Sequence, residues 1–300
     1  NFNEYKKNMK NLINLETILN NLCKNEEFNT KYYFKDLNSN QSINLNGNRI
    51  GPSASTRKIS ILMSAMKAIH EKKVLFDQEI TPPSKYFDND SGCFQYFQKG
   101  FKVKFIDLLT MMIIVSDNVS TGTVTEILSL DYINKYCQDI GMKNTKHLVG
   151  YPDYRDHSKK QLTDDINFVN STTPIDVGNL LELINLGINN SKFAKKLQTT
   201  PDLCSLAMDI MLSQKLNDRI PMKLSNKIKI AHKTGSYMTG YSDCGIIYPF
   251  KHKGFIMCLY TDKVPEYLSN SEVGSYRASN IMSSITLECY NYVTQSVSNK

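Results

Sequence analysis

The sequence predicts an α+β protein of two or three layers, in which an antiparallel five-stranded sheet flanked by terminal helices carries an all-helical domain inserted from the middle of the chain. Strand-like segments gather near the two ends, helical periodicity dominates the residues between them, and an amphipathic helix is expected at each terminus. We therefore expect residues 1–50 and 218–300 to form the sheet domain and residues 51–217 the helical domain, with the functional site in the cleft between them.

The expected elements follow from the spacing of apolar residues. Steps of three and four predict helices, and short β-branched or aromatic runs between turn residues predict strands. The expected helices cover residues 4–23, 55–70, 105–115, 119–130, 131–140, a segment opening at Pro174, 205–216 and 276–293, and the expected strands cover residues 31–36, 41–45, 227–231, 241–248 and 254–261. Residues 144–173 are polar and irregular, and a loop of this length inside a compact domain is more often functional than idle.

Composition excludes several classes of function. The 300 residues carry a net charge of +7 without a dense basic cluster, so the basic surface is interpreted as solvated and no nucleic-acid partner is expected. No apolar run reaches the length of about 18 residues that a membrane span needs. The chain opens at Asn1 without a signal-like apolar segment, so we expect either a cytosolic protein or one whose export segment was removed.

Cysteine usage argues against a metal site. The seven cysteines are odd in number and show no Cys-x-x-Cys spacing, which favours buried free thiols. We expect no metal, no other cofactor and a monomer. Seven thiols also favour, mildly, a reducing compartment.

Ser55 begins the most informative stretch of the sequence. Gly51 and Pro52 precede it, and the apolar helical pattern that follows places Ser55 in a first helical turn, beside free backbone N–H groups. Lys58 lies three residues later, on the same face, where its amine could take a proton from the Ser55 hydroxyl. A second Ser-x-x-Lys begins at Ser64, but well inside the helix, where its hydroxyl is expected to bond a carbonyl one turn back.

Two further polar motifs lie at the ends of apolar elements. Ser116-Asp117-Asn118 follows the apolar segment 105–115, and Lys233-Thr234-Gly235 follows a strand-like run. Each has a simpler interpretation, the first as a helix cap and the second as a strand end and turn. Together with Ser55-x-x-Lys58, however, they form an ordered set.

This set resembles the signature of class A serine β-lactamases and penicillin-binding proteins. The spacings, 61 residues from Ser55 to Ser116 and 117 from Ser116 to Lys233, match the layout of that family. The resemblance extends over nearly the whole chain. It implies a serine nucleophile at Ser55 with Lys58 as its general base, and a proton relay through Ser116 that Lys233 keeps electropositive.

The resemblance also implies substrate contacts. Asn118 would bond the side-chain amide of the substrate, Thr234 and Ser236 its carboxylate, and the N–H groups of Ser55 and Ser236 would form the oxyanion hole. Arg219 matches the place from which some class A members supply a carboxylate-binding arginine, although a surface arginine after a helix end is the alternative. Asp243 and Cys244 occupy the strand region where other members carry that arginine.

One family feature is missing. Class A enzymes carry a Glu in the loop before a Thr-Thr-Pro-like segment, seen here as Thr172-Thr173-Pro174, and this Glu activates the water that releases the acyl group. Between Glu126 and Glu182 the chain contains no Glu. Counting from the two ends of the loop puts the Glu position at His157 or near Tyr151, and the loop arginine at Arg155. Candidate substitutes are His157, Asp156 and Asp153, with Asp164 and Asp165 also in the loop, and the alternative for each is a solvated loop residue.

The resemblance therefore implies a serine hydrolase that β-lactams acylate at Ser55 and that hydrolyses them slowly. Two alternatives stay open: a D-alanyl-D-alanine carboxypeptidase or penicillin-binding protein acting on peptidoglycan stem peptides, and a non-catalytic module that binds peptidoglycan or a protein. The expected partner is a small-molecule β-lactam or a peptidoglycan peptide. The family implies an extracytoplasmic location, which conflicts with the interpretation of the cysteines.

Overall fold

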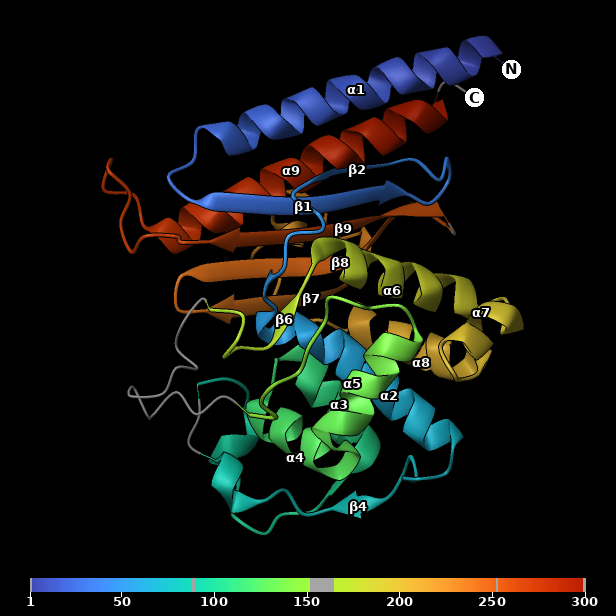
Figure 1. Ribbon diagram of the computed structural model, residues 1–300, viewed down its shortest axis with the longest axis vertical. Helices are drawn as coiled ribbons and strands as arrows, with labels where there is room; N and C mark the ends of the chain where they lie inside the picture. The colour runs from blue at the N-terminus through green and yellow to red at the C-terminus, as the bar shows by residue number, and fades with distance from the viewer. Residues whose placement is uncertain (1, 88–89, 152–164, 252, 299–300) are drawn as a thin grey trace.

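The computed structural model describes residues 2–87, 90–151, 165–251 and 253–298 (Figure 1). Its largest sheet has five antiparallel strands in the order β2-β1-β9-β8-β7. The strands are β1 (Asn29–Asp36), β2 (Ser42–Leu45), β7 (Lys229–Tyr237), β8 (Gly240–Phe250) and β9 (Lys253–Asp262). Both ends of the chain thus contribute to one sheet, and the predicted fold class is confirmed.

Two long terminal helices cover one face of this sheet. In Figure 1, α1 (Phe2–Lys24) and α9 (Gly274–Ser298) lie side by side along β1 and β2. Their apolar stripes pack on the sheet, because Leu19 and Met282 are fully buried in one cluster with Phe34 and Phe255. Burying large apolar side chains of this kind is the main favourable term that joins helices to a sheet.

Helices from the middle of the chain cover the other face. They are α2 (Lys58–His70), α3 (Phe105–Ile114), α4 (Asn118–Leu128), α5 (Leu130–Asp139), α6 (Pro174–Gly187), α7 (Ser191–Lys196) and α8 (Pro201–Leu212). They share a second apolar cluster with sheet residues such as Ala231 and Ile246. The element order agrees with a helical insertion into a sheet, while the domain boundaries at residues 50 and 218 stay a prediction.

Helix α2 lies at the centre of the helical part. The spacing of its apolar residues suggested a single buried face, but every residue from Lys58 to Ala68 is buried. Small residues such as Ser60, Ser64 and Ala65 occupy the remaining faces, which lets other elements approach on all sides. The helix that follows Ser55 is therefore held rigidly from every direction.

Several short elements complete the fold. The sequence did not indicate α7 or the pairing of β3 (Gly51–Pro52) with β6 (Ser171–Thr172), and this pairing joins the end of the long loop to the residues before Ser55. The others are β4 (Glu79–Ile80), β5 (Val103–Lys104) and the 3-10 turns η1 (Ala54–Arg57), η2 (Ser84–Tyr86), η3 (Phe94–Tyr96) and η5 (Ile220–Lys223). No helix in the described ranges combines the length and hydropathy needed to cross a membrane. All seven cysteines are free, and only Cys93 is not buried.

Candidate active site

Ser55 lies in the 3-10 turn η1, which leads directly into α2. Ala54 before it adopts φ 43°, a left-handed conformation that non-glycine residues rarely take. The Thr56 hydroxyl donates to Ser53 O at 2.5 Å and lies 2.9 Å from the Tyr260 hydroxyl on β9, so the turn is fixed to the sheet. Ser55 itself is half-buried. Its side chain therefore lies at the edge of the packed interior, where a reactant can reach it.

Lys58 joins the first motif to the second. Its Nζ lies 2.8 Å from Ser116 O, 3.0 Å from Ser116 Oγ and 2.8 Å from Asn118 Oδ1. The side chain is 2% exposed, so these oxygens replace the water that the amine loses on burial. The structure thus brings Lys58, Ser116 and Asn118 together one helical turn after Ser55.

The tip formed by Ser116-Asp117-Asn118 is held in an unusual conformation. Ser116 has φ 58°, and its carbonyl accepts from both Lys58 and the Ser91 hydroxyl. Asp117 is fully buried and caps α4 by accepting from Ser120 N at 2.8 Å, while its other oxygen accepts from the amides of Cys93 and Phe94. The simpler interpretation as a helix cap is therefore correct for Asp117, whereas its two neighbours bind Lys58. Strained residues of this kind are common at functional sites.

The third motif lies within β7, at the edge of the sheet. The predicted strand ended at Ala231, but β7 continues through Lys233, Thr234 and Gly235 to Tyr237. Gly235 packs against η1 so closely that an added Cβ would lie 3.0 Å from Ser55 N and 3.1 Å from Ala54 Cβ. The three motifs therefore meet in one place.

Two buried amines face this place. Lys233 is fully buried, and its Nζ donates to Thr234 O at 2.7 Å. Burial, opposed by the charge of Asp243 and assisted by the guanidinium of Arg219, lowers the pKa of Lys233 to about 7. Burial also holds the pKa of Lys58 well below its ordinary value, helped by the charges of Lys233 and Arg57. A lowered pKa favours the uncharged amine of Lys58, which is the form that accepts a proton.

Arg219 reaches the end of β7 from the neighbouring segment. Its Nη1 donates to Gly235 O at 2.6 Å and to Ser242 O at 2.7 Å, and its Nη2 donates to Ser236 Oγ at 2.6 Å. The guanidinium also lies over the ring of Tyr241, at 5.4 Å from its centroid. Arg219 is 6% exposed. It is therefore not the surface arginine of the alternative interpretation.

The base of the long loop is attached to the same region. Arg57 donates to Val149 O at 2.8 Å and Gly150 O at 2.5 Å, and Asn170 Oδ1 accepts from the amides of Leu148 and Val149 at 2.8 and 3.1 Å. The carbonyl of Asn170 in turn accepts from Ser53 N. These contacts fix the first residues of the loop to the turn that carries Ser55.

A buried histidine completes this attachment. Arg57 Nη1 lies 3.3 Å from His147 Nδ1, and because a guanidinium only donates, Nδ1 accepts and Nε2 carries the proton. Nε2 lies 3.1 Å from Ser60 Oγ, whose own proton goes to Arg57 O. Burial, together with the charge of Arg57, holds the pKa of His147 well below its usual value. The ring is therefore a neutral structural link.

The proposed substitutes for the loop Glu lie outside the described residues. This applies to Asp153, Asp156, His157, Asp164 and the expected loop arginine Arg155. Among the loop residues that the structure describes, Asp165 is exposed and accepts from the Asn167 backbone and side chain. Tyr151 packs its ring against Tyr86. Over the described ranges, no three His, Cys, Asp or Glu side chains are grouped to hold a metal ion.

The second Ser-x-x-Lys differs from the first as expected. The Ser64 hydroxyl donates to Ser60 O at 2.8 Å, one turn back in α2. Lys67 instead pairs with Glu71 at 2.8 Å.

Sequence reasoning missed several residues of the site. Ser91 supports the tip at Ser116, Asn170 holds the loop base, and His232 on β7 bonds to Asp243 on β8. Their contacts join residues far apart in the chain and have no local sequence signal. Only the alternation of side chains along β7 could have placed His232 on the face that carries Thr234.

Comparisons with known proteins identify the family and the fold. The family model described as "Beta-lactamase enzyme family" matches residues 14–293. The chain therefore belongs to the β-lactamase enzyme family, and its fold is that of class A β-lactamases. Comparison with curated proteins gives no significant match.

Solved structures share the fold over nearly their whole length. A structure of PBP-A is 22% identical with a TM-score of 0.78, covering 94% of this chain and 96% of that one. A PBP-A point mutant, solved as an acyl-enzyme complex with penicillin G, is also 22% identical with a TM-score of 0.78 and covers 95% and 97%. A β-lactamase from Sphaerobacter thermophilus is 16% identical with a TM-score of 0.77 and covers 94% and 97%.

Proposed function

We propose that this protein is a serine acyl-transfer enzyme that β-lactams acylate at Ser55 and that hydrolyses them slowly. One observation carries the proposal: Lys58, a buried amine with a lowered pKa, binds Ser116 and Asn118 one turn after Ser55, while Gly235 packs against Ser55 N. A weak alcohol, a nearby base and backbone donors are the parts that acyl transfer needs.

The contacts suggest a route for the proton. Neutral Lys58 takes the proton of Ser55 as Ser55 Oγ attacks the carbonyl carbon of the β-lactam. The C–N bond of the resulting tetrahedral intermediate then breaks. The 3.0 Å contact between Lys58 Nζ and Ser116 Oγ lets Ser116 deliver a proton to the leaving nitrogen. Lys233, on the other side of the site, favours negative charge there when it is protonated.

Substrate binding follows from β7 and the tip of α4. Asn118 uses Oδ1 on Lys58, so its side-chain NH2 is available for a carbonyl of the substrate. The Ser236 hydroxyl accepts from Arg219, so its own proton is available for a carboxylate together with Thr234. The N–H groups of Ser55 and Ser236 would hold the oxyanion.

Slow release of the acyl group is expected from the loop. The sequence has no Glu between Glu126 and Glu182, and the acidic residue in the described part of the loop, Asp165, is exposed. A misplaced base costs about 100-fold in rate for about 1 Å of displacement. The similarity to PBP-A, of which a point mutant has been solved as an acyl-enzyme complex with penicillin G, agrees with a long-lived acyl group.

Intact mass after incubation with a fluorescent penicillin tests this proposal. We expect one covalent adduct on the wild type, none on Ser55→Ala, and the wild-type amount on Ser64→Ala, the matched control in the second Ser-x-x-Lys. The assignment would be refuted if the wild type showed neither an adduct nor hydrolysis of nitrocefin. It would also be refuted by an undiminished adduct on Ser55→Ala. Rapid nitrocefin turnover would refute the slow release alone.

The missing Glu also favours a second candidate, a D-alanyl-D-alanine carboxypeptidase. In this reaction the same residues attack a peptide bond beside a terminal carboxylate. Release of D-alanine from a peptide ending in D-alanyl-D-alanine, lost in Ser55→Ala, would support the carboxypeptidase. Faster hydrolysis of nitrocefin than of this peptide would support the β-lactamase.

A further inference from the structure

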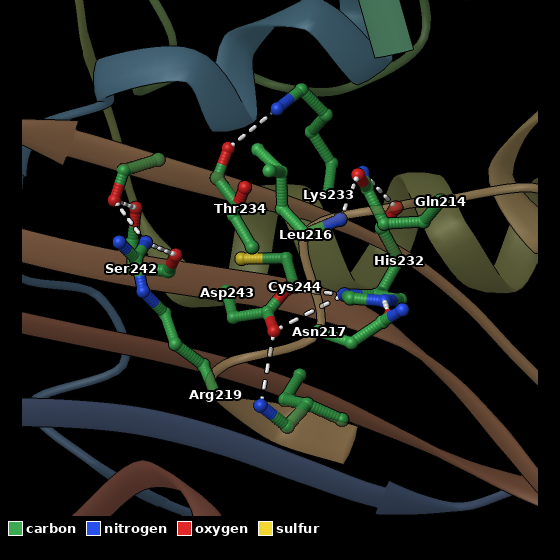
Figure 2. Close-up of polar contacts among 12 residues, drawn as sticks. Gln214, Leu216, Asn217, Arg219, His232, Lys233, Thr234, Ser242, Asp243 and Cys244 are labelled. Atoms are coloured by element: carbon green, nitrogen blue, oxygen red, sulfur yellow. Dashed lines mark hydrogen bonds and ion pairs between the residues drawn. The ribbon is translucent and has the colours of Figure 1, made fainter. Parts of the chain in front are cut away.

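Beneath the end of β7 lies a buried carboxylate that the proposed chemistry does not use. Asp243 on β8 is fully buried and pairs in register with Thr234 on β7. Figure 2 shows its carboxylate bonded to His232, while the guanidinium of Arg219 points away from it toward Ser242. A carboxylate in such a place is costly unless several groups satisfy it, so its partners indicate its role.

Those partners hold the short segment that carries Arg219. Asp243 Oδ2 accepts from Ile220 N at 3.0 Å, directly after Arg219. Asp243 Oδ1 lies 2.9 Å from His232 Nδ1, which must donate because a carboxylate only accepts. The other ring nitrogen of His232 lies 3.0 Å from Asn217 Oδ1. The segment is therefore attached two residues before Arg219 and one residue after it.

The same carboxylate acts on the buried cation Lys233, whereas the carboxylate paired with Arg219 is that of Asp218, at 3.8 Å from Arg219 Nε. Arg219 lies on the face of β7 that carries Ser236, whereas Lys233 projects from the opposite face because side chains alternate along a strand. Asp243 favours the charged form of Lys233, and Arg219 disfavours it. Lys58 on α2 is the next cation, and the charge of Lys233 acts on it in turn.

We propose that Asp243, directly through Ile220 and indirectly through His232 and Asn217, is the positioning residue that holds Arg219 at Ser236, and that its charge also favours the protonated form of Lys233. Asp243 itself touches no reacting atom. Its effect falls on the carboxylate of the substrate, which Arg219, Ser236 and Lys233 face. This inference rests on the proposed acylation of Ser55.

The first test compares two β-lactams that differ only in the carboxylate. Nitrocefin carries the carboxylate and its methyl ester does not. Asp243→Asn keeps the size and an oxygen for Ile220 but removes the charge. We expect acylation by nitrocefin to fall by about 10- to 100-fold, as for the loss of a charged hydrogen bond, and acylation by the ester to change by less than about threefold.

Controls separate this role from a merely structural one. Asp36→Asn removes another buried carboxylate, at the end of β1, whose partners are Asn38 and Ser39. It should leave the ratio of the two acylation rates unchanged. Asn217→Ala removes only the exposed end of the attachment and should lower the ratio in the same direction, by less, so the test stands even if Asp243→Asn does not fold.

The pH profile gives a second readout. Without the Asp243 charge more of Lys233 is neutral at pH 7, so the loss with nitrocefin should shrink as the pH is lowered towards 6. The charged groups that act on Lys233 across the described residues are Asp243 on β8 and Arg219, and Lys58 faces it from α2. Equal losses with both substrates, or an unchanged ratio, would overturn the proposal.

Hydrogen exchange distinguishes failure of this inference from failure of the proposed function. The Ile220 amide should exchange at least about tenfold faster in Asp243→Ala, which removes its acceptor, than in the wild type. This measurement needs no acylation. If the wild type is not acylated but the Ile220 amide exchanges faster in Asp243→Ala, the enzymatic function is refuted and the attachment is kept. If the exchange of the Ile220 amide is the same in both proteins, the attachment is refuted.

Discussion

Gly235 on β7 lies against the backbone nitrogen of Ser55, although 180 residues separate them in the chain. A Cβ added at Gly235 would lie 3.0 Å from that nitrogen and 2.5 Å from Ser242 Oγ. The sheet edge and the turn that carries the nucleophile thus meet without room for a methyl group. The relative position of the proposed nucleophile and the proposed substrate strand depends on this contact.

Gly235→Ala should therefore lower both the rate of acylation and the stability of the protein, and the loss of rate should persist where the stability is recovered. Shifting Ser55 by a few tenths of an ångström is expected to slow acylation by about tenfold or more, since positioning errors are costly in catalysis. Stopped-flow nitrocefin kinetics would measure this. The double variant Gly235→Ala, Ser242→Ala removes the contact with Ser242 Oγ, so it should recover stability but not acylation. Recovery of both would mean that the contact with Ser55 is unimportant.

Lys233→Met should stabilise the protein at neutral pH while abolishing its reaction. The pKa of Lys233 is about 7 in the folded protein and about 10.4 in an unfolded chain. Between these values the unfolded state binds more protons, so the free energy of unfolding of the wild type rises with pH in that range. The advantage of Lys233→Met should then shrink from pH 7 to pH 10. Urea denaturation at several pH values checks this, and a constant difference would contradict it.

Asn170→Ala should destabilise the loop base. It leaves the amides of Leu148 and Val149 without their acceptor, which is expected to cost about 2 kcal/mol. Asn170→Asp keeps an oxygen at the same place and should restore most of the stability. Thermal unfolding measures both variants. Equal losses in the two variants would show that the acceptor oxygen is not what matters.

His147→Gln should flatten the loss of stability in acid. The pKa of His147 is lowered on folding, so below about pH 6.5 the unfolded state binds a proton that the folded state excludes. The free energy of unfolding of the wild type therefore decreases as the pH is lowered. Glutamine lacks this titration. Urea denaturation between pH 7 and pH 5 should give a shallower slope for the variant. Identical slopes would argue against a neutral His147.

Much of this molecule could be predicted from local pattern. The periodicity around Leu62 and Leu180 indicated buried helices, and the order of elements indicated a sheet completed from both ends of the chain. Three short motifs sufficed to name Ser55 and Lys58 as candidates, because their order and spacing along the chain resemble the signature of a known enzyme family.

Contacts that depend on long-range register could not be predicted. The Asp243–His232 pair requires that Thr234 face Asp243, which follows from the tight hairpin after Tyr237 and not from either strand alone. The burial of α2 on all sides was also missed, because periodicity marks large apolar residues and overlooks small ones such as Ser60. The pairing of β3 with β6 is too short to leave a pattern.

Cys93 is a site where the protein can be labelled with a thiol-reactive reagent. Six of the seven thiols are buried, and burial makes such groups unreactive towards alkylating reagents, whereas Cys93 is only half-buried and its amide binds Asp117 beside Ser116. Its pKa is raised by partial burial and by the charge of Asp117, so labelling should proceed best under mildly alkaline conditions. A fluorophore attached there would sit beside the proposed reaction centre and report occupancy without any engineered cysteine.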